Sequence, residues 1–171
     1  MLIEKKVDGF EKVWHSTFYK PTRNDQDNTS KMLLRFKEGN KDSKYRINAQ
    51  IGNDFRNNHY KFDIILRALS STETKIIDNH PLDDICKNIA DITGAIYQPG
   101  LLSKKRTHTP LKRLNANERI RELKDIYVFE GGVELKNKKI LIVDDIITSR
   151  ATIQAIRIAL YRIESNAHYF A

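Results

Sequence analysis

Two adjacent carboxylates, Asp144 and Asp145, directly follow the apolar run ILIV at residues 140–143. In α/β sheets ligands bind beyond the carboxyl ends of parallel strands, so this position predicts that both acids lie at the mouth of a site. Neighbouring carboxylates repel each other where water is scarce, and we therefore expect hydroxyl donors or a cation beside them. Each carboxylate can accept hydrogen bonds from the hydroxyls of a vicinal diol.

The segment TSRAT at residues 148–152 is expected to open a helix. The unpaired backbone N–H groups at a helix start can hold a phosphate, helped here by the hydroxyls of Thr148, Ser149 and Thr152. Carboxylates that accept hydrogen bonds from a diol, next to a helix start that binds a phosphate, would form a site for a 5-phosphoribosyl group.

Two other interpretations of the acids are open. In the first, Asp145 or Thr148 caps the helix and Asp144 is a solvated strand end. In the second, ILIVDD opens a phospho-accepting receiver domain, whose paired acids hold magnesium. A receiver domain needs most of its fold after this strand, and residues 146–171 are too few to supply it.

The composition sets broad limits on fold and partners. A chain of 171 residues with 40% hydrophobic side chains can bury one sizeable core, which predicts a single domain. Its net charge of +8 favours polyanionic partners such as nucleic acid, nucleotides or phosphorylated sugars. Cys86 is the only cysteine, so no internal disulfide can form. Without a membrane-length apolar run or a signal-peptide core, the sequence predicts a cytoplasmic protein with no membrane partner.

Strand and helix patterns alternate along the chain. The predicted strands are 62–66, a short one within 95–102, 126–129 and 139–143. The predicted helices are one capped by Ser30 and ended by Gly39, one carrying Ile47, Ile51 and Phe55, one at 82–93, one from Asn115 to about Leu123, and one carrying Ile153, Ile156, Leu160 and Ile163. This alternation favours an α/β fold with a mostly parallel, twisted sheet flanked by helices. We divide the chain into an amino-terminal helical hood, 1–60, and a core, 61–171.

The stretch ILIVDDIITSRAT, residues 140–152, resembles the phosphoribosyl pyrophosphate motif of type I phosphoribosyltransferases. That motif has four apolar residues, two acids, two variable residues, Thr-Thr or Thr-Ser, then usually Gly, Gly or Ala, and Thr. Residues 33–39 and 106–129 are similar to the ComF-like branch associated with competence proteins. The matching positions in the second stretch are Arg106, Thr109, Pro110, Leu114, Arg119 and Phe129.

This resemblance implies a type I phosphoribosyltransferase fold and a magnesium-dependent pentosyltransferase. The enzyme would transfer phosphoribosyl from phosphoribosyl pyrophosphate to an unidentified acceptor and release pyrophosphate. Asp144 and Asp145 would be the catalytic pair and would hold the ribose hydroxyls, directly or through Mg²⁺. The residues implied for the 5-phosphate are Ile147, Thr148, Ser149, Arg150, Ala151 and Thr152.

The resemblance also implies a pyrophosphate loop after an earlier strand. The residues that fit this loop are Arg67, Ala68, Ser70 and Ser71. A flexible loop usually closes over the substrate, and residues 102–110 are basic, polar and expected to lack secondary structure. Lys104, Lys105 and Arg106 in this segment would cover the diphosphate.

Three positions depart from the pattern. Arg150 stands where most family members have glycine, which lets backbone approach a phosphate closely. Leu111 and Glu122 stand where the ComF-like pattern has Gln and Asn. Arg150 and the net charge of +8 support an alternative: a non-catalytic protein with this fold that senses a ribose phosphate, or a component of a nucleic-acid-handling system for competence or defence. Because related folds often pair, a homodimer or a complex partner is also expected.

Overall fold

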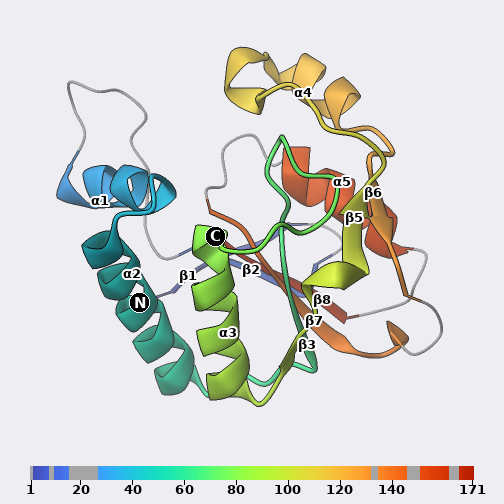
Figure 1. Ribbon diagram of the computed structural model, residues 1–171. Helices are drawn as coiled ribbons and strands as arrows, with labels where there is room; N and C mark the ends of the chain where they lie inside the picture. Colours follow the sequence, from blue (N-terminus) through green and yellow to red (C-terminus); the bar gives the residue numbers. More distant parts are fainter. Residues whose placement is uncertain (1, 8–9, 16–26, 132–134, 146–150, 162–165) are drawn as a thin grey trace.

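A six-stranded sheet forms the centre of the computed structural model, which describes residues 2–7, 10–15, 27–131, 135–145, 151–161 and 166–171 (Figure 1). Its strand order is β1-β2-β8-β7-β3-β4. The strands are β1 (Ile3–Lys5), β2 (Lys12–His15), β3 (Ile64–Arg67), β4 (Ile96–Tyr97), β7 (Lys139–Val143) and β8 (Asn166–Phe170). Only β1 pairs antiparallel with its neighbour, so the sheet is mixed but mostly parallel, as the alternation of elements predicted.

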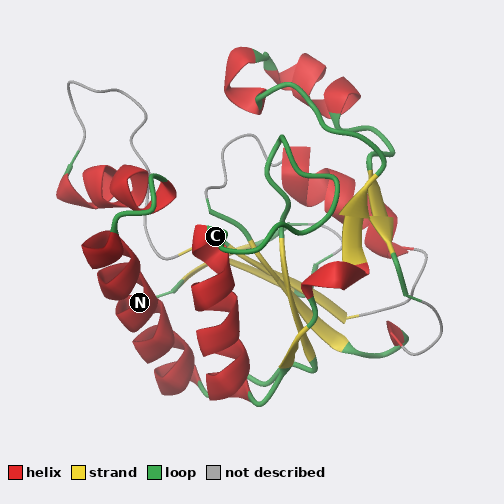
Figure 2. Cartoon of the chain, in the orientation of Figure 1, coloured by secondary structure: helices red, strands yellow, loops and turns green. Residues whose placement is uncertain are grey.

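Helices cover both faces of this sheet (Figures 1 and 2). On one face lie α1 (Asn28–Lys37), α2 (Lys41–Asn58) and α3 (Pro81–Thr93). The other face carries α5 (Ala151–Leu160) and an antiparallel pair of strands, β5 (Leu102–Lys104) and β6 (Tyr127–Phe129). The segments around this pair contain two 3₁₀ helices and one short helix: η2 (Pro99–Leu101), η3 (Leu111–Arg113) and α4 (Ala116–Glu122).

The central strands are apolar over Ile64–Leu66 of β3 and Ile140–Val143 of β7, where both of their faces are covered. Ile64 and Leu66 join the core beneath α5, whereas Ile65 joins the core beneath α1–α3. Along β7 the same alternation sends Ile140 to the first core and Leu141 to the second. A strand that is buried on both faces has a continuous apolar run in its sequence, and this pattern predicted β3 and β7.

Helix α3 follows directly from its boundary residues. The side chain of His80 and that of Asp83 form a capping box at its start, and Pro81 occupies the first turn, where its missing N–H is no loss. Gly94 ends the helix with φ of 75°, a left-handed conformation that glycine adopts without strain. The predicted helix at 82–93 is confirmed.

The predicted cap of α1 is wrong by three residues. Asp27, not Ser30, is the N-cap, and its Oδ1 accepts a hydrogen bond of 2.7 Å from the backbone N–H of Ser30. Ser30 is instead buried in the first helical turn. The run from Asp27 to Ser30 contains only residue types that favour N-caps, so composition alone does not choose among them.

The amino-terminal segment contributes strands as well as helices. β2 pairs parallel with β8, so the beginning and the end of the chain lie side by side in the sheet. Residues 102–110 were expected to lack secondary structure, and this expectation is wrong for 102–104, which form β5. Within the described part of the chain, no helix has the length and apolarity needed to cross a membrane.

Candidate functional site at the carboxyl edge of the sheet

Three parallel strands end at the same edge of the sheet. The register pairs Val143 at the end of β7 with Arg67 at the end of β3 on one side and with Phe170 of β8 on the other. Just past the strands, the N–H of Ala68 donates to the carbonyl of Val143, and the N–H of Asp144 donates to the carbonyl of Phe170, both at 2.8 Å. The Asp144–Asp145 pair therefore lies beside the loop that follows β3.

Asp144 is partly buried and held by two hydrogen bonds. Its Oδ2 accepts from the hydroxyl of Tyr169 at 2.5 Å, and its Oδ1 accepts from the N–H of Asp145 at 2.8 Å. The pKa of Asp144 is raised to about 6, first because burial disfavours the charged carboxylate and next because Asp145 repels it. The bond from Tyr169 acts in the opposite direction.

Asp145 pairs with a cation from the helical layer. Its Oδ2 lies 2.6 Å from Nζ of Lys37, the last residue of α1. Both side chains keep about a third of their surface exposed, so the pair stands in contact with solvent. The sequence predicted that a hydroxyl donor or a cation would accompany the acids, but it did not indicate Tyr169 or Lys37 as the suppliers.

Tyr169→Phe tests the hydrogen bond from the Tyr169 hydroxyl to Asp144. Loss of the phenol donor should raise the pKa of the Asp144 carboxyl further, by roughly one pH unit, since a hydrogen bond to a charged group contributes about 1.5–3 kcal/mol. Carbon-13 NMR of the carboxyl group over pH 4–9 measures this. Tyr161→Phe, at a tyrosine that is 87% exposed, is the matched control and should change nothing. An unchanged titration in Tyr169→Phe would mean that the phenol does not hold this carboxylate.

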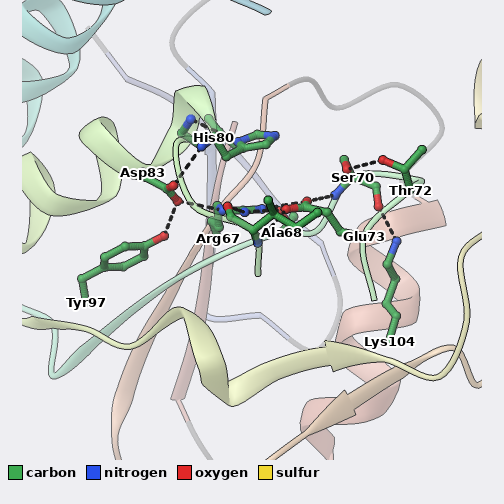
Figure 3. Close-up of polar contacts among 11 residues, drawn as sticks. Arg67, Ala68, Ser70, Thr72, Glu73, His80, Asp83, Tyr97 and Lys104 are labelled. Carbon is green, nitrogen blue, oxygen red and sulfur yellow. Dashed lines mark hydrogen bonds and ion pairs between the residues drawn. The ribbon is translucent and has the colours of Figure 1, made fainter. Parts of the chain in front are cut away.

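Arg67 lies at the end of β3 with a fully buried guanidinium (Figure 3). It forms a bidentate pair with Glu73, with Nη1 2.9 Å from Oε2 and Nη2 2.6 Å from Oε1, and its Nε donates to Oδ1 of Asp83 at 2.8 Å. Its Nη groups also donate to the carbonyls of Ala68 and Ile77. The guanidinium that was predicted to bind pyrophosphate thus donates its hydrogen bonds to protein acceptors. These bonds connect the loop after β3 to α3.

Glu73 and Asp83 complete this buried network. Burial alone would raise the pKa of Glu73, but the bonds from Arg67 and from the N–H of Ser70 outweigh it and hold the pKa at about 2. Asp83 also accepts from the hydroxyl of Tyr97 at 2.7 Å and from the N–H of His80 at 3.0 Å. With every charge paired, the network holds the turn at residues 70–73 in one geometry.

The three basic residues of the predicted covering loop have different surroundings. Lys104 is 4% exposed, and its Nζ donates to the carbonyl of Ser70 at 2.5 Å. Arg106 pairs with Glu122, Nη1 to Oε1 at 3.3 Å, and donates to the Glu122 carbonyl at 2.8 Å. Lys105 is exposed. The structure therefore separates a buried lysine, an ion-paired arginine and a solvated lysine.

The predicted 5-phosphate segment is described only in part. Ile147, Thr148, Ser149 and Arg150 lie outside the described residues. Ala151 and Thr152 form the first residues of α5, with Ala151 buried and Thr152 partly exposed. The predicted helix after β7 is confirmed over 151–160, and Ile163 lies outside the described residues.

The carboxylate pair has the donor chemistry that magnesium prefers. Within the described ranges no group of three or more His, Cys, Asp or Glu side chains could hold a metal ion. Magnesium in phosphate-transfer sites commonly takes one or two carboxylates and completes its shell with water and substrate oxygens. Asp144 and Asp145 fit that smaller requirement.

No protein-family model matches this chain. A search of curated proteins also finds no match. The functional assignment accordingly depends on the sheet-edge geometry and on the motif at residues 140–152.

Proposed function

We propose that this chain binds 5-phosphoribosyl pyrophosphate and, with magnesium, transfers its phosphoribosyl group to an acceptor. The observation that carries the proposal is the meeting of the Asp144–Asp145 pair with the braced loop after β3 at one edge of the sheet. In the type I phosphoribosyltransferase fold implied by residues 140–152, ribose and diphosphate are held at those positions. Residues 33–39 and 106–129 resemble the ComF-like branch of this family.

The carboxylates would hold the ribose ring. Asp144 and Asp145 each accept hydrogen bonds from the 2′ and 3′ hydroxyls, and Lys37 leaves Asp145 as the ligand enters. Breaking the bond to pyrophosphate leaves positive charge on the ribose, which nearby carboxylates stabilise. Tyr169 keeps the Asp144 carboxylate oriented toward the ring.

The two ends of the ligand would be held by backbone and hydroxyl groups. The backbone N–H groups in the first described turn of α5 and the hydroxyl of Thr152 would hold the 5-phosphate. The loop after β3 would offer the N–H of Ser71 and the hydroxyls of Ser70 and Ser71 to the diphosphate. Magnesium, when bound, neutralises the leaving diphosphate. Catalysis then depends mainly on holding the acceptor in line with the anomeric carbon, and no covalent nucleophile on the protein is needed.

Arg150 favours a second candidate, a ligand sensor that does not turn over. A side chain at a position where glycine is usual can add a guanidinium contact to phosphate or fill the space that phosphate needs. Together with the net charge of +8, it also keeps a role with nucleic acid open.

Calorimetry with phosphoribosyl pyrophosphate and magnesium, followed by a pyrophosphate-release assay over a panel of nucleobases, separates these candidates. Binding with release in the presence of one base would identify the enzyme and its acceptor. Binding without release over the panel would favour the sensor. Absence of binding, together with tight binding of single-stranded DNA, would overturn the proposal in favour of the nucleic-acid role.

A further inference from the structure

Lys104 is a buried lysine at the root of an exposed basic segment. It faces inward from β5 opposite Tyr127 of β6, and its Nζ lies 5.9 Å from the centre of the Tyr127 ring. Burial lowers the pKa of its ammonium group to about 8, with Glu73 opposing this effect and Arg106 adding to it. An ammonium group held away from water costs free energy unless specific acceptors offset the loss. The side chain therefore needs the contacts that it makes.

Those contacts go to both ends of one turn, and Figure 3 shows the one to Ser70. Nζ of Lys104 donates to the carbonyl of Ser70 at 2.5 Å, and its backbone N–H donates to the carbonyl of Thr74 at 2.7 Å. From the opposite side, Glu73 accepts from the N–H of Ser70 at 2.7 Å. The turn at residues 70–74 is thus clamped between β5 and the Arg67 network.

The Ser70 carbonyl accepts a second hydrogen bond, from the N–H of Glu73 at 3.1 Å, which closes the turn. Together with Lys104, this donor sets the orientation of one peptide group. In a trans peptide the C=O and the N–H point in opposite directions. Since the carbonyl of Ser70 faces Lys104, the N–H of Ser71 in the same peptide group faces away from Lys104. The Ser71 carbonyl accepts from the N–H of His108 at 3.0 Å, but among the described residues no acceptor receives the Ser71 N–H. Ser71 is also partly exposed, so the residue lies at the surface of the loop.

We propose that Lys104 is a positioning residue for diphosphate: its ammonium group polarises the Ser70–Ser71 peptide and, with the N–H of Glu73, holds it so that the Ser71 N–H binds the anion. This inference rests on the proposed function and names the group that prepares its diphosphate loop. Lys104 acts from behind the loop and does not touch the ligand. A charged donor on the carbonyl strengthens the N–H at the other end of the peptide, and the positive charge beneath the loop adds attraction for an anion.

Lys104→Met tests the proposal against Lys87→Met, a substitution of an exposed lysine on α3. Inorganic pyrophosphate, phosphoribosyl pyrophosphate and ribose 5-phosphate are titrated into each protein by calorimetry. We expect Lys104→Met to weaken binding of the two diphosphates by about tenfold, the effect of one lost charge-assisted hydrogen bond, and to leave ribose 5-phosphate within about twofold. Lys87→Met should leave all three affinities unchanged. Lys104→Arg, which restores a charged donor, should recover part of the loss.

A measurement on the unsubstituted chain keeps the test valid if Lys104→Met does not fold. Bound pyrophosphate should raise the pKa of Lys104 by roughly one pH unit, which carbon-13 NMR of its Cε measures. Bound pyrophosphate should also shift the Ser71 amide resonance. Ribose 5-phosphate should do neither.

The outcomes separate this inference from the proposed function. If the chain binds phosphoribosyl pyrophosphate and neither the Lys104 pKa nor the Ser71 resonance responds to pyrophosphate, the inference fails and the function stands. Equal diphosphate affinity in a folded Lys104→Met variant has the same meaning. If the unsubstituted chain binds neither diphosphate, both proposals fail.

Discussion

Replacing Asp144 and Asp145 together by asparagine is expected to abolish binding of ribose 5-phosphate and phosphoribosyl pyrophosphate. Each carboxylate provides a charged acceptor, and hydrogen bonds to charged groups contribute about 1.5–3 kcal/mol apiece. Losing two of them should weaken binding at least about a hundredfold. Calorimetry with both ligands, with and without magnesium, measures the change.

The matched control replaces Asp84 and Asp91 by asparagine. Both are exposed acids on α3, so this variant removes the same net charge without touching the sheet edge. It should bind within about twofold of the unsubstituted chain. If the Asp144→Asn/Asp145→Asn variant is folded and keeps its affinity, the ribose-binding role of these acids is wrong.

The melting temperature of the Asp144→Asn variant should change in a direction that the pKa of Asp144 predicts. The pKa of Asp144 in the folded chain, about 6, lies above its ordinary value of 3.8, so ionising this group costs folding free energy. That cost is absent below about pH 4 and grows as the pH rises through 6. Asp144→Asn should therefore raise the melting temperature at pH 7.5 and leave it nearly unchanged at pH 4. A lower melting temperature at pH 7.5 would show that the carboxylate has a net structural role.

Arg67→Met is expected to cause the largest loss of stability. The substitution leaves Glu73 and Asp83 as buried carboxylates without their cation, and breaking a buried ion pair in this way typically costs about 3–5 kcal/mol. Urea denaturation at pH 7 measures the free energy of unfolding. Arg56→Met is the matched control, because Arg56 is exposed and donates only to the side chain of Asn53 among the described residues. It should change stability by less than about 0.5 kcal/mol.

The same network makes a prediction about acid. Glu73 has its pKa lowered from 4.5 to about 2, so its pairing stabilises the fold above pH 4.5 and is lost as the pH falls from 4.5 toward 2. Arg67→Met should remove this part of the acid sensitivity. A loss of less than about 1 kcal/mol at pH 7 would contradict the view that Arg67 braces the loop.

The sequence predicted those elements whose signals are local. Strand β7 is a continuous apolar run, and α3 carries its own cap, proline and terminal glycine, so neither needs distant information. Strands β2 and β8 were not predicted, because their pairing joins Val13 to Tyr169 across nearly the whole chain. No local pattern specifies such a register.

The candidate site was predicted in outline for the same reason. A strand that ends on two acids indicates a sheet-edge site, and the acids do lie there beside the loop after β3. The structural role of Arg67 could not be predicted from the sequence. A cation at a strand end is consistent with ligand binding until the acids that pair with it are known. Glu73 and Asp83 reach it only through the folding of the loop onto α3. Lys37 likewise comes to Asp145 from another layer of the fold.

A crystal structure of the chain with ribose 5-phosphate bound tests the central claim most directly. The account predicts the 2′ and 3′ hydroxyls within hydrogen-bond distance of Asp144 and Asp145, the phosphate at the start of α5, and Lys37 withdrawn from Asp145. A sugar phosphate bound elsewhere, or both aspartates turned to bulk water with no room for an anion at the helix start, would contradict it.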